Sequence, residues 1–112
     1  MIAGPQPFLI VRAQIDGSVM VDFRRWYQDI HLPHLLAIPG IVQAHTVKQR
    51  SNAFNWMALY EFAPETEIQE AMQSAEAQLA RDDWNSWSDH VRDFSVEIYA
   101  GLAALPALHH WN

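Results

Sequence analysis

The sequence predicts a single α+β domain in which a four-stranded antiparallel sheet carries two main helices on one face. Four β-prone segments and two segments with helical spacing follow one another in the order β-α-β-β-α-β, which is the ferredoxin-like arrangement. Half of the 112 residues are hydrophobic, and no segment has the composition of a linker. Residues 1–112 therefore have the size and the apolar content of one domain with one core.

The first half of the chain is predicted to form a strand and a helix. The β-branched and apolar run from Phe8 to Gln14 predicts the strand. Either Asp16 or Ser18 is a suitable cap for the helix that follows, and Pro33 predicts that this helix ends or kinks near His31. The apolar residues that recur at helical spacing are Val19, Phe23, Trp26, Tyr27 and Ile30.

The second half is predicted to contain a hairpin, a second helix and a last strand. The predicted strands are Ile41 to Arg50, Phe54 to Phe62 and Phe94 to Ala100, with residues 51–53 as the tight turn of the hairpin. Pro64 is typical of the first turn of a helix. The apolar stripe of that helix is Ile68, Met72, Ala75 and Leu79. Asp82 or Asp83 is suited to cap a short extra helix.

The two strands expected in the middle of the sheet, the first and the third, are apolar on both faces. The second and fourth strands carry more polar positions, as edge strands do. Two helices cover only one face, so the other apolar face needs a cover as well. The simplest cover is the sheet of a second copy, which predicts a homodimer. The apolar tail from Leu102 to Trp111 is expected to lie across a subunit.

Composition and charge argue against several classes of function. The chain has seven basic and thirteen acidic residues, a formal charge of −6 and no basic run, so we expect no nucleic acid and no membrane as a partner. The absence of cysteine excludes disulfides, thiolate metal sites and a cysteine nucleophile. No signal-like segment is recognisable, so we expect a cytoplasmic protein. Neither a phosphate loop nor a dinucleotide fingerprint is present, and we expect no cofactor.

The segment from Phe23 to Val42, FRRWYQDIHLPHLLAIPGIV, resembles the dimeric α/β barrel superfamily, in particular its EthD-like and related small branches. The shared features are an aromatic pair, a His-x-Pro motif and a Pro-Gly turn, which here are Trp26-Tyr27, His31-Leu32-Pro33 and Pro39-Gly40. The order of the elements and a late tryptophan region, Trp84 to Trp87, match as well. The resemblance implies the dimeric α/β barrel fold. It implies no single reaction, because the superfamily includes cyclases, lactone isomerases, monooxygenases and haem-degrading enzymes.

His31 is the leading candidate for a catalytic residue. Phe23, Tyr27 and His31 are spaced by four, so His31 borders the apolar face of the helix. An imidazole at the edge of an apolar pocket can act as a base or an acid near neutral pH. The alternative is a histidine at a helix end that bonds to main-chain carbonyls.

Two further histidines and a tyrosine are the other catalytic candidates. His34 lies three residues after His31, a spacing that invites a metal, but Pro33 interrupts a continuous helix between them and we expect no metal. His45 and Tyr60 lie on predicted strands, where either side chain is suited to stabilise an enolate.

Aromatic residues are the candidates for substrate binding, since the chain has five tryptophans. We expect a pocket between the first helix and the sheet. Its predicted lining consists of Phe23, Trp26, Tyr27, Trp56 and Tyr60, with Trp87 as a further substrate-binding candidate.

Together these residues predict a cofactor-independent lyase, isomerase or cyclase for a small, largely apolar or aromatic carbonyl compound. His31 would remove a proton next to the carbonyl group. One alternative is a cofactor-free monooxygenase of an aromatic substrate. The other is a dimeric protein without enzymatic activity that binds a hydrophobic ligand, with haem among the candidates.

Overall fold

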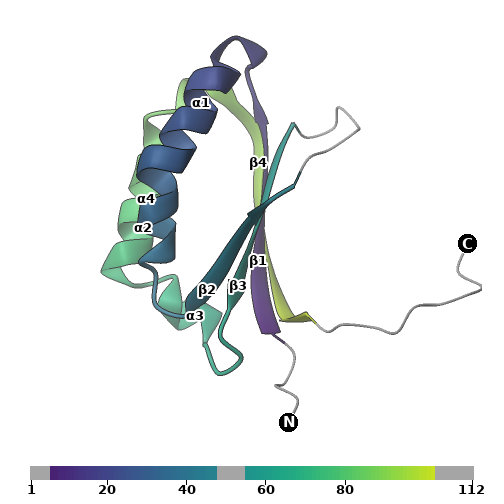
Figure 1. Ribbon diagram of the computed structural model, residues 1–112, viewed down its shortest axis with the longest axis vertical. Helices are drawn as coiled ribbons and strands as arrows, with labels where there is room; N and C mark the ends of the chain where they lie inside the picture. Colours follow the sequence, from purple (N-terminus) through teal and green to yellow (C-terminus); the bar gives the residue numbers. More distant parts are fainter. Residues whose placement is uncertain (1–5, 48–54, 103–112) are drawn as a thin grey trace, which may run out of the picture.

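The computed structural model describes residues 6–47 and 55–102, which form one sheet with helices packed along one side (Figure 1). In chain order the elements are β1 (Gln6–Ile15), a 3-10 turn (Gly17–Val19), α1 (Met20–Trp26), a π-helical turn (Tyr27–His31), α2 (Leu32–Leu36), β2 (Ile41–Thr46), β3 (Trp56–Phe62), α3 (Ile68–Ala71), α4 (Ala75–Asn85), a second 3-10 turn (Ser88–His90) and β4 (Val91–Leu102). Within the described ranges, no helix has the length and hydrophobicity that a membrane crossing requires.

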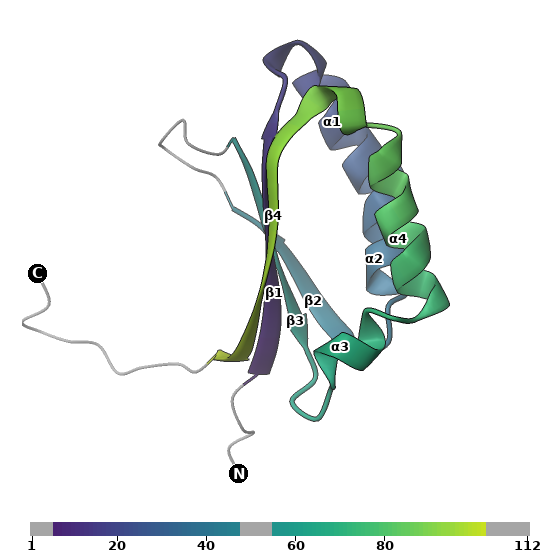
Figure 2. The ribbon, with the colours of Figure 1, turned by 180° about the vertical axis from the view of Figure 1, so that it is seen from behind.

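The sheet confirms the predicted fold class. Its strand order is β2-β3-β1-β4, and each neighbouring pair is antiparallel. The first and third strands are therefore central, and the second and fourth are the edges. Figure 2 shows the other side of the molecule, where α2 and α4 lie next to each other on the same face of the sheet. This is the ferredoxin-like arrangement.

The strand register assigns each side chain to a face of the sheet. Val11 pairs with Ala58 on β3 and with Val96 on β4, and these side chains lie on the face that the helices cover. Ile10 pairs with Leu59, so these two lie on the opposite face. The helix face of β3 is closed, since Trp56, Ala58, Tyr60 and Phe62 are all buried. On the edge strand β4, the side chains on the helix face remain about half exposed; they are Phe94, Val96 and Ile98.

The strand bounds differ from the prediction at several ends. β1 extends to Ile15 because its main chain continues to pair with Val91 beyond the apolar run. β2 ends at Thr46. Val47, which was predicted to continue this strand, lies beyond its end, and β3 begins at Trp56 and not at Phe54. Residues 48–50 of the predicted strand, the tight turn and Phe54 lie outside the described residues. Nearly all of the predicted tail lies outside them as well.

A bulge in β4 brings Phe94 to the helix face. Arg12 pairs with Ser95 and Gln14 pairs with Arg92, so one residue of β1 faces two residues of β4. Asp93, in the bulge, has a φ of 54°, a left-handed conformation that aspartate tolerates better than most residues. Phe94 then points toward the helices and contacts the ring of Trp84 edge-on, with 5.1 Å between centroids.

The first helix continues where the sequence predicted an end or a kink. α1 passes into the π-helical turn, in which the N–H of Leu32 donates to the carbonyl of Tyr27, and then into α2. Pro33 follows directly after the π-helical turn, at one of the first two positions of α2, and it has no N–H to donate to that turn. The wide turn replaces the predicted break.

The predicted N-terminal caps of this helix are also corrected. Neither the 3-10 turn nor α1 has a side-chain cap. The carboxylate of Asp16 instead contacts His90 and Arg92 at 3.4 Å, and α1 begins only after the 3-10 turn that contains Ser18.

The second helical region differs most from its prediction. Pro64 lies in a turn, and helical structure begins only at Ile68. α3 ends after one turn, and α4 begins anew with Ser74 as its cap, whose Oγ accepts from the N–H of Ala77 at 3.1 Å. The restart rotates the helix, so Ala77 and Ala80 are buried while Ala75 and Leu79 of the predicted stripe are exposed. α4 also continues through Asp82 and Asp83, so neither caps a further helix.

Candidate functional site

An apolar cavity of about 340 Å³ lies between the sheet and the helices α2 and α4. We call it the inner cavity. Its apolar lining consists of Leu9, Val11, Leu35, Met72, Ala77, Ala80, Trp84, Phe94, Val96 and Ile98. His31, Tyr60 and Arg81 add the titratable and charged groups. A volume of this size and a largely apolar wall with a few polar groups are typical of a site for a small ligand.

The sequence predicted that His31 lies at the edge of a pocket. In the structure its ring lies in the protein interior and forms part of the wall of the inner cavity. Its side chain is only 1% exposed. The ring stacks on Trp26 at a centroid distance of 4.9 Å and meets the edge of Trp84 at 5.3 Å. The π-helical turn ends at His31, and π-helical turns are frequent at functional sites.

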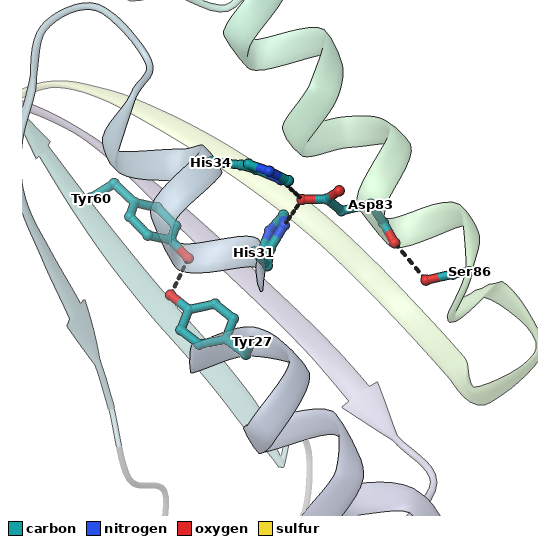
Figure 3. A network of polar contacts seen from close by, with 6 residues as sticks. All are labelled: Tyr27, His31, His34, Tyr60, Asp83 and Ser86. Carbon is teal, nitrogen blue, oxygen red and sulfur yellow. Dashed lines mark hydrogen bonds and ion pairs between the residues drawn. The ribbon is translucent and has the colours of Figure 1, made fainter. Parts of the chain in front are cut away.

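The carboxylate of Asp83 on α4 binds His31 and His34 with one oxygen. Its Oδ2 lies 2.9 Å from Nδ1 of His31 and 2.7 Å from Nδ1 of His34, as Figure 3 shows. A carboxylate only accepts, so each Nδ1 carries the proton and donates. The unprotonated nitrogen of a neutral His31 is therefore Nε2.

The environment shifts the pKa values of both partners. Burial lowers the pKa of His31, and its hydrogen bond to Asp83 opposes this only in part. Partial burial of Asp83 favours a higher pKa, but the hydrogen bonds from His31 and His34 outweigh it and lower the pKa of the carboxyl group. At neutral pH the site therefore holds a neutral His31 beside an ionised Asp83.

Two tyrosine hydroxyls form a second polar group beneath the cavity. The hydroxyl oxygens of Tyr27 and Tyr60 are 2.5 Å apart (Figure 3). Burial raises the pKa of both phenols, most strongly that of Tyr60, so both stay protonated at neutral pH. Tyr60 lines the inner cavity. When Tyr27 donates to Tyr60, the Tyr60 hydroxyl is left to donate to a ligand oxygen.

The other aromatic candidates do not line the inner cavity. Phe23, Tyr27 and Trp56 are buried in the core, where the ring of Phe23 meets that of Trp56 at 5.0 Å. Trp26 and Trp87 border a different hollow of about 440 Å³ on the outside, together with Val19, Asp22, Ser86 and His90. Of the predicted pocket lining, only Tyr60 lies in the inner cavity, because that cavity opens beside β4 and not beside α1.

His45 lies on the opposite face of the sheet from His31. It pairs with Leu59, whereas its neighbour Ala44 pairs with Tyr60 on the helix face. Its Nε2 is 2.6 Å from Oε2 of Glu61. The structure therefore brings His31 and Tyr60 to the inner cavity, links His34 to His31 through Asp83, and leaves His45 on the other side of the sheet.

His31, His34 and Asp83 do not surround an empty position in which a metal ion could bind. Both Nδ1 atoms are directed at the carboxylate oxygen itself. Among residues 6–47 and 55–102, no group of three or more histidine, aspartate or glutamate side chains is placed to hold a metal ion.

Asp83 and the β4 wall are the parts of the site that sequence reasoning missed. The sequence predicted that Asp83 caps a short extra helix, because one helix was expected to end and another to begin near this residue. The alternation of Phe94, Val96 and Ile98 predicted a strand with one apolar face, but it did not show that this face borders a cavity.

No protein-family model matches the sequence, and the comparison with curated proteins gives no match. Solved structures share the fold. An EthD-family protein from Bacillus halodurans superimposes with a TM-score of 0.65 at 16% identity, over 82% of this chain and 96% of that one. SnoaB, a cofactor-independent oxygenase from Streptomyces nogalater, gives a TM-score of 0.60 at 10% identity, over 92% and 99%. The chain therefore shares the ferredoxin-like α+β fold of these proteins.

Proposed function

We propose that the inner cavity is the active site of a cofactor-independent enzyme in which His31 removes a proton from a small, largely apolar carbonyl compound. One observation carries the proposal: a histidine that hydrogen-bonds to a carboxylate lines a cavity whose walls are otherwise mostly apolar. Burial lowers the pKa of His31 and so favours its neutral, basic form. A general base with these surroundings is available at neutral pH without a prior loss of a proton.

Asp83 prepares His31 for this role in two ways. Its hydrogen bond to Nδ1 selects the tautomer in which Nε2 is the base. Its negative charge stabilises the imidazolium that forms when Nε2 accepts the proton, as a buried carboxylate does in other histidine-dependent sites. His34 binds the same oxygen and helps to hold the carboxylate in place.

Tyr60 is the group suited to the substrate oxygen. Loss of a proton next to a carbonyl group places negative charge on the oxygen, and a buried hydroxyl donor stabilises that charge. Tyr27 fixes the orientation of Tyr60 by the hydrogen bond between the two hydroxyls. The resulting enolate takes its proton back from the His31 imidazolium at another carbon in an isomerase. In a lyase or a cyclase it goes on to break or form a carbon–carbon bond.

A cofactor-free monooxygenase is the second candidate, and the similarity in fold to a cofactor-independent oxygenase favours it. The first step is the same proton transfer to His31. The carbanion then reduces O₂, so that a CH₂ group and one O₂ become a carbonyl group and one water. The substrate itself supplies the electrons.

Deuterium uptake tests the proton transfer without knowledge of the natural substrate. 2-Tetralone is a small aromatic ketone with acidic hydrogens next to its carbonyl group. In D₂O the protein is expected to accelerate their exchange above the rate in buffer, as NMR would show.

The rate of exchange should fall as the pH drops through the lowered pKa of His31, because the imidazolium cannot accept a proton. Consumption of O₂ in step with product would identify the monooxygenase, whereas binding of the ketone without exchange would contradict the assigned base.

The opposite face of the sheet supports a homodimer as part of this proposal. The helices leave this face uncovered. Its central strands carry the apolar residues Phe8, Ile10, Met57 and Leu59, of which Met57 and Leu59 are partly exposed. A symmetric partner that packs its own sheet there is the economical cover. Light scattering at micromolar concentration should give the mass of two chains, and the mass of one chain would refute the dimer.

A further inference from the structure

Arg81 stands at the opening of the inner cavity and has no ionic partner among the described residues. Its guanidinium donates to the main-chain carbonyl of Met72 at 2.6 Å and to Oε1 of Gln78 at 3.0 Å, and both acceptors are uncharged. The acidic neighbours on α4 are engaged elsewhere: Asp82 accepts from Gln78 and Asp83 from the two histidines. The positive charge of Arg81 is thus not neutralised by an ion pair within the part of the chain that is described.

A second hollow adjoins the inner cavity at this residue. It measures about 380 Å³ and is lined by Arg81, Trp84, Asn85, Ser88, Val91 and Phe94. The two spaces share three lining residues, Arg81, Trp84 and Phe94. They therefore adjoin each other where the rings of Trp84 and Phe94 are in contact. We call this second space the outer hollow. Its wall has polar side chains, Asn85 and Ser88, that the inner cavity lacks.

The distribution of charge and polarity along these two spaces points to a ligand with two parts. The deep part, at His31, is largely apolar, and the only permanent charge among the residues that line either space is the guanidinium of Arg81. A guanidinium has several N–H groups in a planar fork that fits a carboxylate. A ligand that fills both spaces would place its apolar body in the inner cavity and an anionic group at Arg81.

We propose that the substrate is a largely apolar keto acid: Arg81 binds its carboxylate, and the part of the molecule that carries the reactive carbonyl group lies beside His31 and Tyr60. This inference rests on the proposed function, since it assigns the substrate class of the same cavity. It makes Arg81 a residue that determines specificity, not one that takes part in the proton transfer.

A matched pair of ligands tests this assignment by calorimetric titration. 2-Naphthoate and 2-naphthamide share one apolar body and differ mainly in charge. The protein is expected to bind the carboxylate about fivefold more tightly, the usual upper range for a solvent-accessible ion pair. This preference should shrink at high salt, which screens such a pair. Arg81→Gln should abolish the preference and leave the affinity for the amide unchanged, and Arg81→Lys should keep part of it.

Arg92→Gln is the control, because Arg92 is an exposed arginine outside both spaces and its removal changes the net charge equally. It should keep the preference for the carboxylate. Equal binding of the two ligands by the unmodified protein would overturn the role of Arg81 and leave the proposed active site standing. Binding of neither ligand would overturn both, since the inner cavity would then not accept an apolar ring.

Discussion

His31→Asn is expected to lower the rate of proton exchange by about 10²- to 10⁴-fold, the usual contribution of a general base. Asparagine can place an N–H near the position of Nδ1 and so keep the hydrogen bond to Asp83, but it has no counterpart of the basic Nε2. This variant is preferable to His31→Ala, because His31 is buried between Trp26 and Trp84 and its complete removal would leave a void and an unpaired carboxylate.

His90→Asn is the control for this prediction. His90 also faces a carboxylate through Nδ1, that of Asp16 at 3.4 Å, but it is half exposed and lies outside the inner cavity. Its replacement should leave the exchange rate unchanged. Exchange at the full rate in a folded His31→Asn protein would remove His31 from the mechanism.

Phe23→Ala is expected to lower the free energy of unfolding by about 3–5 kcal/mol, the range for removal of a buried aromatic ring. The side chain of Phe23 is fully buried at the centre of the aromatic core. The rings of four tryptophans, Trp26, Trp56, Trp84 and Trp87, lie within 5.6 Å of its centroid. Their size and rigidity limit how far they can close the void. Urea denaturation at a fixed protein concentration measures the loss.

Val21→Ala gives the comparison on the same helix. Val21 is 72% exposed, so its truncation should change the free energy of unfolding by less than about 0.5 kcal/mol. A loss of similar size in both variants would mean that the aromatic core around Phe23 does not dominate the stability of this domain.

The sheet was predictable because its signal is local. The apolar runs around Val11 and Ala58 are two-sided, while those around His45 and Glu97 alternate with polar residues, and this contrast alone identifies central and edge strands. Burial on both faces favours apolar side chains along most of a central strand, and the few charged exceptions, Arg12 and Glu61, lie on the face away from the helices.

The helices were less predictable where two local signals conflict. Pro33 favours a break, but a π-helical turn ahead of it lets the chain continue. Pro64 favours a helix start, but the cap that forms is Ser74, ten residues later in the chain, and it sets a different buried face. In both cases packing against the sheet decides between alternatives that propensity leaves close in energy.

The site was half predictable. His31 was found from its spacing with Phe23 and Tyr27 and from a resemblance in motif. Asp83 was not found, because it lies 52 residues away from His31 and only the packing of α4 against α2 brings the two together. His45 was a candidate because it is a histidine like His31. Only the register of β2 with β3 shows that His45 lies on the face of the sheet opposite the helices.

The protonation of the His31 ring is the most direct test of this account. A long-range ¹H–¹⁵N correlation spectrum of the labelled protein at pH 7 distinguishes the two neutral tautomers from the imidazolium ion. The hydrogen bond to Asp83 and the burial of the ring predict a neutral His31 with its proton on Nδ1 and a free Nε2. They also predict that the ring becomes charged only below its ordinary pKa of about 6.5. A proton on Nε2, or a charged ring at pH 7, would contradict the assignment of His31 as the base.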